Sequence, residues 1–149
     1  MALVIDSSIA LSWFFPDERT GFTEAALTLA GQEECWVPAV WRLEFPNALL
    51  VAERRRRLTR DERLHVLEEA SRLALRVDAT VHDVRQISHL ASQAGLTTYD
   101  ATYLELAQRL AAPLITLDRE LANAATQVGV AVHAPGRNST AQLRERYNV

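Results

Sequence analysis

The sequence predicts an α/β protein, an α/β/α sandwich in which helices cover both faces of a parallel sheet of about five strands. Two observations lead to this fold class. Short apolar runs rich in β-branched residues, such as 2–5 and 114–117, are typical of strands buried on both faces. Segments of helical periodicity, one or two at a time, separate successive runs, as right-handed crossovers between parallel strands require.

The first half of the chain is predicted to contain two strands and four helices. Strands are expected at 2–5 and 35–37, and helices at about 7–15, 18–30, 39–57 and 59–75. Pro16 closes the first helix and Gly31 the second, because proline and glycine are usual at or just beyond helix ends. Thr59 and Glu62 form a capping-box motif that opens the fourth helix.

The second half is predicted to complete the sheet with three strands. Strands are expected at 76–77, 114–117 and 130–132, and helices at about 81–94, 98–111 and 118–127. Gly95 and Gly129 follow the ends of the first and third of these helices. We expect one domain over 1–149, with a core of about 1–133 and a polar tail of about 134–149 that has a possible short helix at 140–147.

The composition is that of an ordinary globular protein, with 48% apolar residues, 23% charged residues and a net charge of −3. This charge argues against constitutive, charge-driven nucleic-acid binding, although metal ions can reverse the sign of an acidic pocket. Cys35 is the single cysteine, which suits a reducing compartment and a packing role. With no apolar run of membrane length and no signal-peptide pattern, we expect a cytoplasmic protein without a membrane partner.

The chain contains no lysine, so all 16 basic residues are arginines. Schiff-base chemistry and a P-loop lysine are therefore excluded. The five glycines are not clustered, so a glycine-rich phosphate cradle is absent from the sequence as well. Any phosphate chemistry must use arginines, helix N-termini or metal ions.

Four acidic residues are predicted to lie at one edge of the sheet. Asp6 and Asp118 directly follow two strands, Asp100 lies in the first turn of a helix, and Glu44 lies on the helix that follows the second strand. The carboxyl ends of parallel strands share one edge, and binding sites form outside it. The four carboxylates are therefore candidates for a common site.

Each acid also has an ordinary structural explanation. Asp6 and Asp118 suit helix N-caps, Thr97-x-x-Asp100 matches a capping box, and Glu44 suits an exposed helix face. These explanations do not account for the joint arrangement. If the acids converge, repulsion raises their pKa values unless a cation is present. Mg²⁺ or Mn²⁺ binds such oxygen ligands, and two ions about 4 Å apart can clamp a phosphodiester and activate water.

Four segments, LVIDSSIAL, LEFPNAL, YDATYLELA and ITLDREL, resemble the motifs of PIN domains and in particular of VapC toxins from type II toxin–antitoxin modules. Their order and spacing cover the chain from Asp6 to about Val132. The resemblance implies a metal-dependent ribonuclease that cleaves RNA, forms a homodimer and is silenced by a cognate antitoxin protein. It also implies an α/β/α sandwich, in agreement with the fold class above.

The resemblance makes Asp6, Glu44, Asp100 and Asp118 the catalytic, metal-binding acids. Asp6, Asp100 and Asp118 would form the main site, and Glu44 would act on a second ion or through water. Supporting roles fall on Ser8, Asn47 and Thr116, for which capping, surface and strand-packing roles are the alternatives. Pro46 lies inside the helix that carries Glu44 and could turn this side chain towards or away from the other acids.

Two other functions remain open from the sequence. One is a metal-dependent phosphatase or DNA nuclease on a similar fold, and the other is a non-catalytic acidic pocket in a regulatory binding module. Arginines at 54–57 suit either a helix C-terminus or contact with RNA phosphates or an acidic antitoxin segment. Arg119, next to Asp118, is the better-placed candidate for a phosphate contact.

Overall fold

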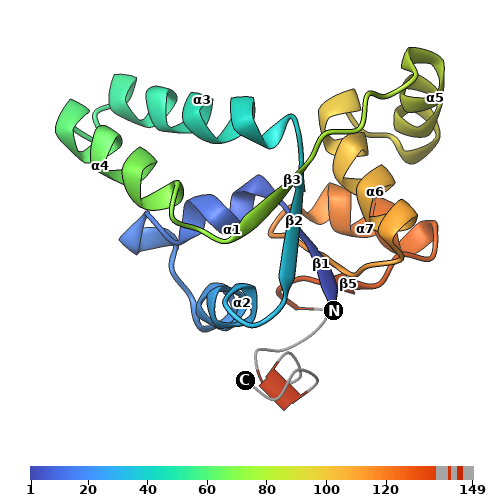
Figure 1. The fold of residues 1–149 in the computed structure, drawn as a ribbon, viewed down its shortest axis with the longest axis horizontal. Helices are drawn as coiled ribbons and strands as arrows, with labels where there is room; N and C mark the ends of the chain where they lie inside the picture. Colours follow the sequence, from blue (N-terminus) through green and yellow to red (C-terminus); the bar gives the residue numbers. More distant parts are fainter. Residues whose placement is uncertain (137–140, 142–143, 146–149) are drawn as a thin grey trace.

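A computed structural model describes residues 1–136, 141 and 144–145; the short helix expected at 140–147 falls largely outside them. Five parallel strands form one sheet in the order β3-β2-β1-β4-β5 (Figure 1). The strands are β1 (Ala2–Ile5), β2 (Glu34–Pro38), β3 (Leu75–Asp78), β4 (Leu114–Ile115) and β5 (Val132–His133). The predicted α/β/α architecture is confirmed.

Helices cover both faces of the sheet. They are α1 (Ser7–Ser12), α2 (Gly21–Ala30), α3 (Trp41–Arg54), α4 (Arg60–Ala70), α5 (Val84–Ala94), α6 (Thr98–Leu110) and α7 (Arg119–Gln127). Leu3 and Ile5 pack in a core with α1 to α4, whereas Val4 packs in a second core with α6 and α7 (Figure 1). This alternation along β1 is the period of two that places successive strand side chains on opposite faces.

Several predicted helices are longer than the observed ones. The predicted helix at 7–15 ends at Ser12, and a 3₁₀ turn follows at Pro16–Glu18. The helix predicted from residue 18 begins at Gly21, because Thr20 and Thr23 form a reciprocal capping box there. The last strand is β5 rather than 130–132, since the N–H of Val130 donates to the carbonyl of Ala125 and completes the end of α7.

Two residues that attracted interest in the sequence have packing roles. Cys35 is buried, and burial raises its pKa to about 12, so the thiol stays protonated at neutral pH. Arg57, from the basic run, pairs with Asp17 and Glu18 and lies 4.5 Å above the ring of Phe15. It therefore connects the end of α3 to the turn that follows α1.

Within the part of the chain that the structure describes, every helix is too short or too polar to cross a membrane.

Candidate active site

The four predicted acids come from four different elements at the carboxyl edge of the sheet. Asp6 follows β1, and Asp118 is the N-terminal capping residue of α7, just after β4. Glu44 lies in the first turn of α3 and Asp100 in the first turn of α6. Because β1 lies between β2 and β4, Asp6 occupies the middle of this edge.

Two hydroxyl groups fix the Asp6 side chain. Ser8 Oγ donates to Asp6 Oδ2 at 2.7 Å, and Thr116 Oγ1 donates to the same oxygen at 2.8 Å. The same hydroxyls accept hydrogen bonds from the backbone N–H groups of Leu117, at 3.1 Å, and Asp118, at 2.9 Å. These bonds join Asp6 to the segment that follows β4. The Ser7 hydroxyl lies 3.4 Å from Asp6 Oδ1, and the Ser7 backbone also donates to the Asp6 carboxylate.

The predicted capping roles hold for one aspartate and not for the other. Asp118 Oδ1 accepts from the N–H groups of Glu120 and Leu121, as a capping residue does. Asp6 occupies the N-cap position of α1 but forms no side-chain capping bond, so its predicted capping role is wrong. The reason is geometric, because the hydroxyls of Ser8 and Thr116 hold the carboxylate towards β4.

Glu44 faces the other acids. Its Oε1 accepts a hydrogen bond of 2.7 Å from the hydroxyl of Tyr103, which is fully buried on α6. Pro46 therefore does not turn Glu44 away from the site. Half of the predicted capping box is present at Asp100, whose N–H donates to Thr97 Oγ1 at 3.1 Å.

The acids repel one another. Burial is the main cause that raises the pKa of Asp6, Glu44 and Asp100 above the ordinary values of carboxylic acids. Neighbouring carboxylates raise these pKa values further: Asp118 acts on Asp6 and Asp100, and the charges of Asp6 and Asp100 act on Glu44. Hydrogen bonds from neutral hydroxyl groups lower these pKa values, but they offset the rise only in part. The edge therefore concentrates negative charge that a cation would offset.

The predicted supporting residue Asn47 and the predicted metal-binding cluster are not fully formed in the structure. Asn47 is exposed, one turn after Glu44 on α3, and its side chain has no hydrogen bond to another described residue. Among the described residues, no three histidine, cysteine, aspartate or glutamate side chains stand close enough together to hold a metal ion as they are. The four acids thus surround a common region without forming a closed chelate.

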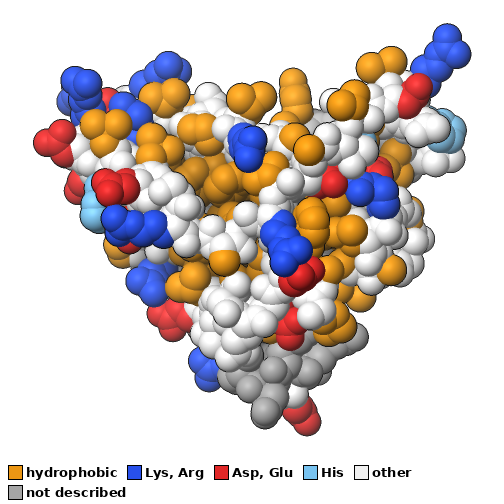
Figure 2. All heavy atoms as spheres, in the orientation of Figure 1, with side chains coloured by type: hydrophobic (Ala, Val, Ile, Leu, Met, Phe, Trp, Pro, Cys, Tyr) orange, Lys and Arg blue, Asp and Glu red, His pale blue; other side chains and the backbone are white. Residues whose placement is uncertain are grey.

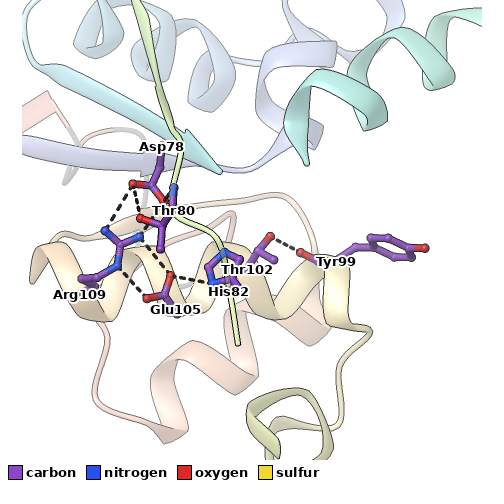
Figure 3. A network of polar contacts seen from close by, with 7 residues as sticks. All are labelled: Asp78, Thr80, His82, Tyr99, Thr102, Glu105 and Arg109. Atoms are coloured by element: carbon purple, nitrogen blue, oxygen red, sulfur yellow. Dashed lines mark hydrogen bonds and ion pairs between the residues drawn. The ribbon is translucent and has the colours of Figure 1, made fainter. Parts of the chain in front are cut away.

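A fifth acid at the same edge behaves differently. Asp78 ends β3 and is 9% exposed, but Arg109 of α6 reaches it through Nη2 at 2.7 Å (Figure 3). Burial alone would raise the pKa of Asp78, yet hydrogen bonds from Arg109 and Thr80, with the arginine charge, lower it overall. Arg109 also pairs with Glu105, which lies 3.8 Å from His82 (Figure 3). Asp78 is thus part of a neutralised network that joins β3 to α6.

Sequence reasoning missed Tyr103 and Asp78. Tyr103 stands three residues after Asp100, a spacing that places both on one helix face, and this spacing is the signal that could have found it. Asp78 ends a strand as Asp6 does, so its position alone would have suggested a site residue. Only the contact with Arg109, 31 residues further along the chain, identifies it as structural.

A parallel α/β/α sheet with unpaired carboxylates at its carboxyl edge defines a class of domain that binds its ligand beyond the strand ends. The sequence pattern of the PIN domain matches residues 3–127, and the chain belongs to this family. Over 124 residues, which are 82% of this chain and 93% of the relative, it is 35% identical to Ribonuclease VapC3 of Pyrobaculum aerophilum.

Solved structures share the fold at low sequence identity. The crystal structure of PAE2754 from Pyrobaculum aerophilum has a TM-score of 0.69 at 20% identity, and the match covers 99% of this chain and 90% of that one. VapBC2 from Rickettsia felis, bound to a DNA fragment from their promoter, has a TM-score of 0.65 at 13% identity, covering 90% and 98%. FitAcB from Neisseria gonorrhoeae has a TM-score of 0.65 at 17% identity, covering 92% and 99%.

Proposed function

We propose that this protein is a divalent-metal-dependent endoribonuclease that acts as the toxin of a toxin–antitoxin pair. One observation carries the proposal: four carboxylates from four elements face one edge, and none has an ion-pair partner among the described residues. RNA as the substrate is supported by the 35% identity to a protein named a ribonuclease over most of both chains.

The donor set fits a hard divalent cation. Carboxylate oxygens are the ligands that Mg²⁺ and Mn²⁺ prefer, and a thiol would not suit them. In the proposal Asp6, Asp100 and Asp118 hold the main ion, and Glu44 acts on a second ion or through water. When bound, the metal supplies Lewis-acid stabilisation of the phosphodiester and a water of lowered pKa.

The chain's own groups prepare this site. Ser8 and Thr116 occupy Asp6 Oδ2, which leaves Oδ1 as the oxygen available for a ligand. Tyr103 occupies Glu44 Oε1 in the same way. Since the acids repel one another and form no closed chelate, we expect a cation to draw them together and to stabilise the fold.

The same edge also presents apolar surface suited to protein partners. Leu43, Val81, Val84 and Tyr99 are between 62% and 94% exposed, at or near the starts of α3, α5 and α6. Figure 2 shows hydrophobic side chains along the upper rim of the molecule, over α3 and α5. Exposed apolar groups of this size commonly mark protein contacts. They support a homodimer and an antitoxin partner, and the likeness to VapBC2 and FitAcB agrees with the latter.

The test is to incubate the purified chain with total RNA and Mg²⁺ or Mn²⁺ and to map the cut ends. Asp6→Asn and EDTA are the negative controls, and Asp61→Asn, an exposed acid in the first turn of α4, is the matched control. Discrete cuts that need metal and Asp6 are expected. Stabilisation by metal without cleavage would support a binding module instead, and hydrolysis of DNA or phosphomonoesters alone would support the other enzyme class.

A further inference from the structure

We propose that a cavity beside Asp118 is a nucleotide subsite, which holds and reads one unstacked base next to the scissile phosphate. The proposal rests on the proposed ribonuclease function and adds to it a means of choosing where RNA is cut. The cavity has a volume of about 410 Å³, within the range of about 300–1,000 Å³ typical of small-ligand sites. Asp118 is one of its lining residues, so the cavity borders the acidic edge at this residue.

The walls and the rim of the cavity differ in chemistry. Leu117, Ala122 and Pro135 supply apolar walls, which suit the faces of a nucleobase. Arg119 and Asn123 supply polar groups. Proteins that read RNA sequence commonly splay out single bases, stack them on aromatic or arginine side chains and bind their edges with polar groups, and enzymes that take a base out of the stack also hold it between apolar side chains. The lining therefore matches one nucleotide of single-stranded RNA.

Arg119 is positioned for the phosphate. Its side chain is exposed, and its guanidinium group has no hydrogen bond or ion pair with another described residue, whereas Arg57, Arg63 and Arg109 are all paired with carboxylates. It lies at the first position of α7, where the positive end of the helix dipole disfavours a cation. Among the described residues this arginine makes no side-chain contact that would explain its position, and at the rim of a cavity it suits an anionic ligand.

Asn123 is positioned for the base. It follows Arg119 by four residues on α7, so both side chains lie on one helix face, and both line the cavity. An asparagine amide presents a donor and an acceptor together, and this pair can match the edge of a base. A nucleotide held by these two residues would have its phosphodiester beside Asp118, one of the four acids of the candidate site.

The first measurement is binding, in the Asp6→Asn chain, which is expected not to cleave. The probe is a set of fluorescent RNA hexamers of random sequence, with each position fixed in turn. Arg119→Ala should weaken binding of all sequences about tenfold and reduce the salt dependence by about one phosphate contact. Asn123→Ala should reduce the preference for one base by about tenfold and leave overall affinity nearly unchanged. Arg85→Ala, an exposed unpaired arginine in the first turn of α5, is the matched control.

The second measurement maps cut sites with the otherwise wild-type chain. Asn123→Ala should broaden the base found beside the cut. If Arg119→Ala and Asn123→Ala bind and cut as the Arg85→Ala control does, the subsite is refuted while the nuclease stands. If no variant cleaves RNA, the proposed function fails, and the hexamer measurement still decides whether the cavity reads a base. If Asn123→Ala weakens the binding of all hexamers equally and leaves the base preference unchanged, the role of Asn123 in reading the base is also refuted.

Discussion

Replacing Asp6 with asparagine should make the metal-free protein more stable at neutral pH. Asp6 is 5% exposed, and burial raises its pKa above the ordinary value of an aspartic acid. A carboxyl group whose pKa is raised in the folded state weakens the fold fully at pH values above that pKa, and the weakening declines to zero as the pH falls to the unfolded pKa. Asparagine has nearly the same shape, and its carbonyl oxygen can accept both hydroxyl hydrogen bonds.

The size of the effect follows from linkage. Each pKa unit of the rise corresponds to about 1.4 kcal/mol, and each kcal/mol shifts the Tm of a chain of this length by about 2–4 °C. Metal should reverse the order of the two melting temperatures. At a free metal concentration of about 100 times the Kd, a bound ion stabilises the wild type by about 2.7 kcal/mol, which raises its Tm by about 5–11 °C. Asp6→Asn lacks one charged ligand, so metal should stabilise it much less.

Thermal melts between pH 5 and 8, in EDTA and in Mn²⁺, measure both effects, with Asp61→Asn as the control. We expect Asp6→Asn to melt above the wild type in EDTA, to show a smaller advantage at pH 5 than at pH 8, and to melt below the wild type in Mn²⁺. Its cleavage rate should fall by about 1,000-fold, since a loss of about 4 kcal/mol in transition-state stabilisation has that effect. A variant that melts below the wild type in EDTA and gains equally from Mn²⁺ would refute the metal-ligand role of Asp6.

Three further substitutions test individual contacts. Thr116→Val removes the hydroxyl that joins β1 to the end of β4, so urea denaturation should show a loss of about 1–3 kcal/mol. Tyr103→Phe releases Glu44, so half-maximal cleavage should need about tenfold more Mn²⁺; an unchanged metal dependence would contradict this role. Arg109→Ala leaves Asp78 unpaired and should cost about 1–2 kcal/mol in stability, with cleavage by the folded fraction unchanged within about twofold.

The fold class could be predicted from the sequence because strands and helices each produce a recognisable local pattern of apolar residues. Buried runs such as 2–5 and the periodic segments between them identify a parallel sheet without any tertiary information. Element ends were less predictable, because they depend on single hydrogen bonds. Thr20 starts α2 through its bonds with Thr23, and the backbone bond from Val130 to Ala125 moves the last strand to Val132–His133.

The positions of the four acids were also predictable, but not every contact they make was. Asp6 and Asp118 were found because strand ends share an edge, and the family resemblance gave Ser8 and Thr116 supporting roles. By contrast, the resemblance gave Tyr103 no role, and its bond to Glu44 joins residues 59 positions apart. Contacts at such separations are set by how helices pack on the sheet, and a single sequence does not display that packing.

The strongest functional argument comes from comparing two aspartates that look alike in the sequence. Asp6 and Asp78 both end strands of the same sheet and are both buried. Asp78 has Arg109 beside it and a lowered pKa, whereas neutral hydroxyls and another carboxylate surround Asp6, whose pKa is raised. In a chain with 16 arginines, neutralising Asp6 would need only one arginine nearby. A fold that neutralises one of these acids and leaves the other among like charges retains a charge imbalance that a divalent cation can correct.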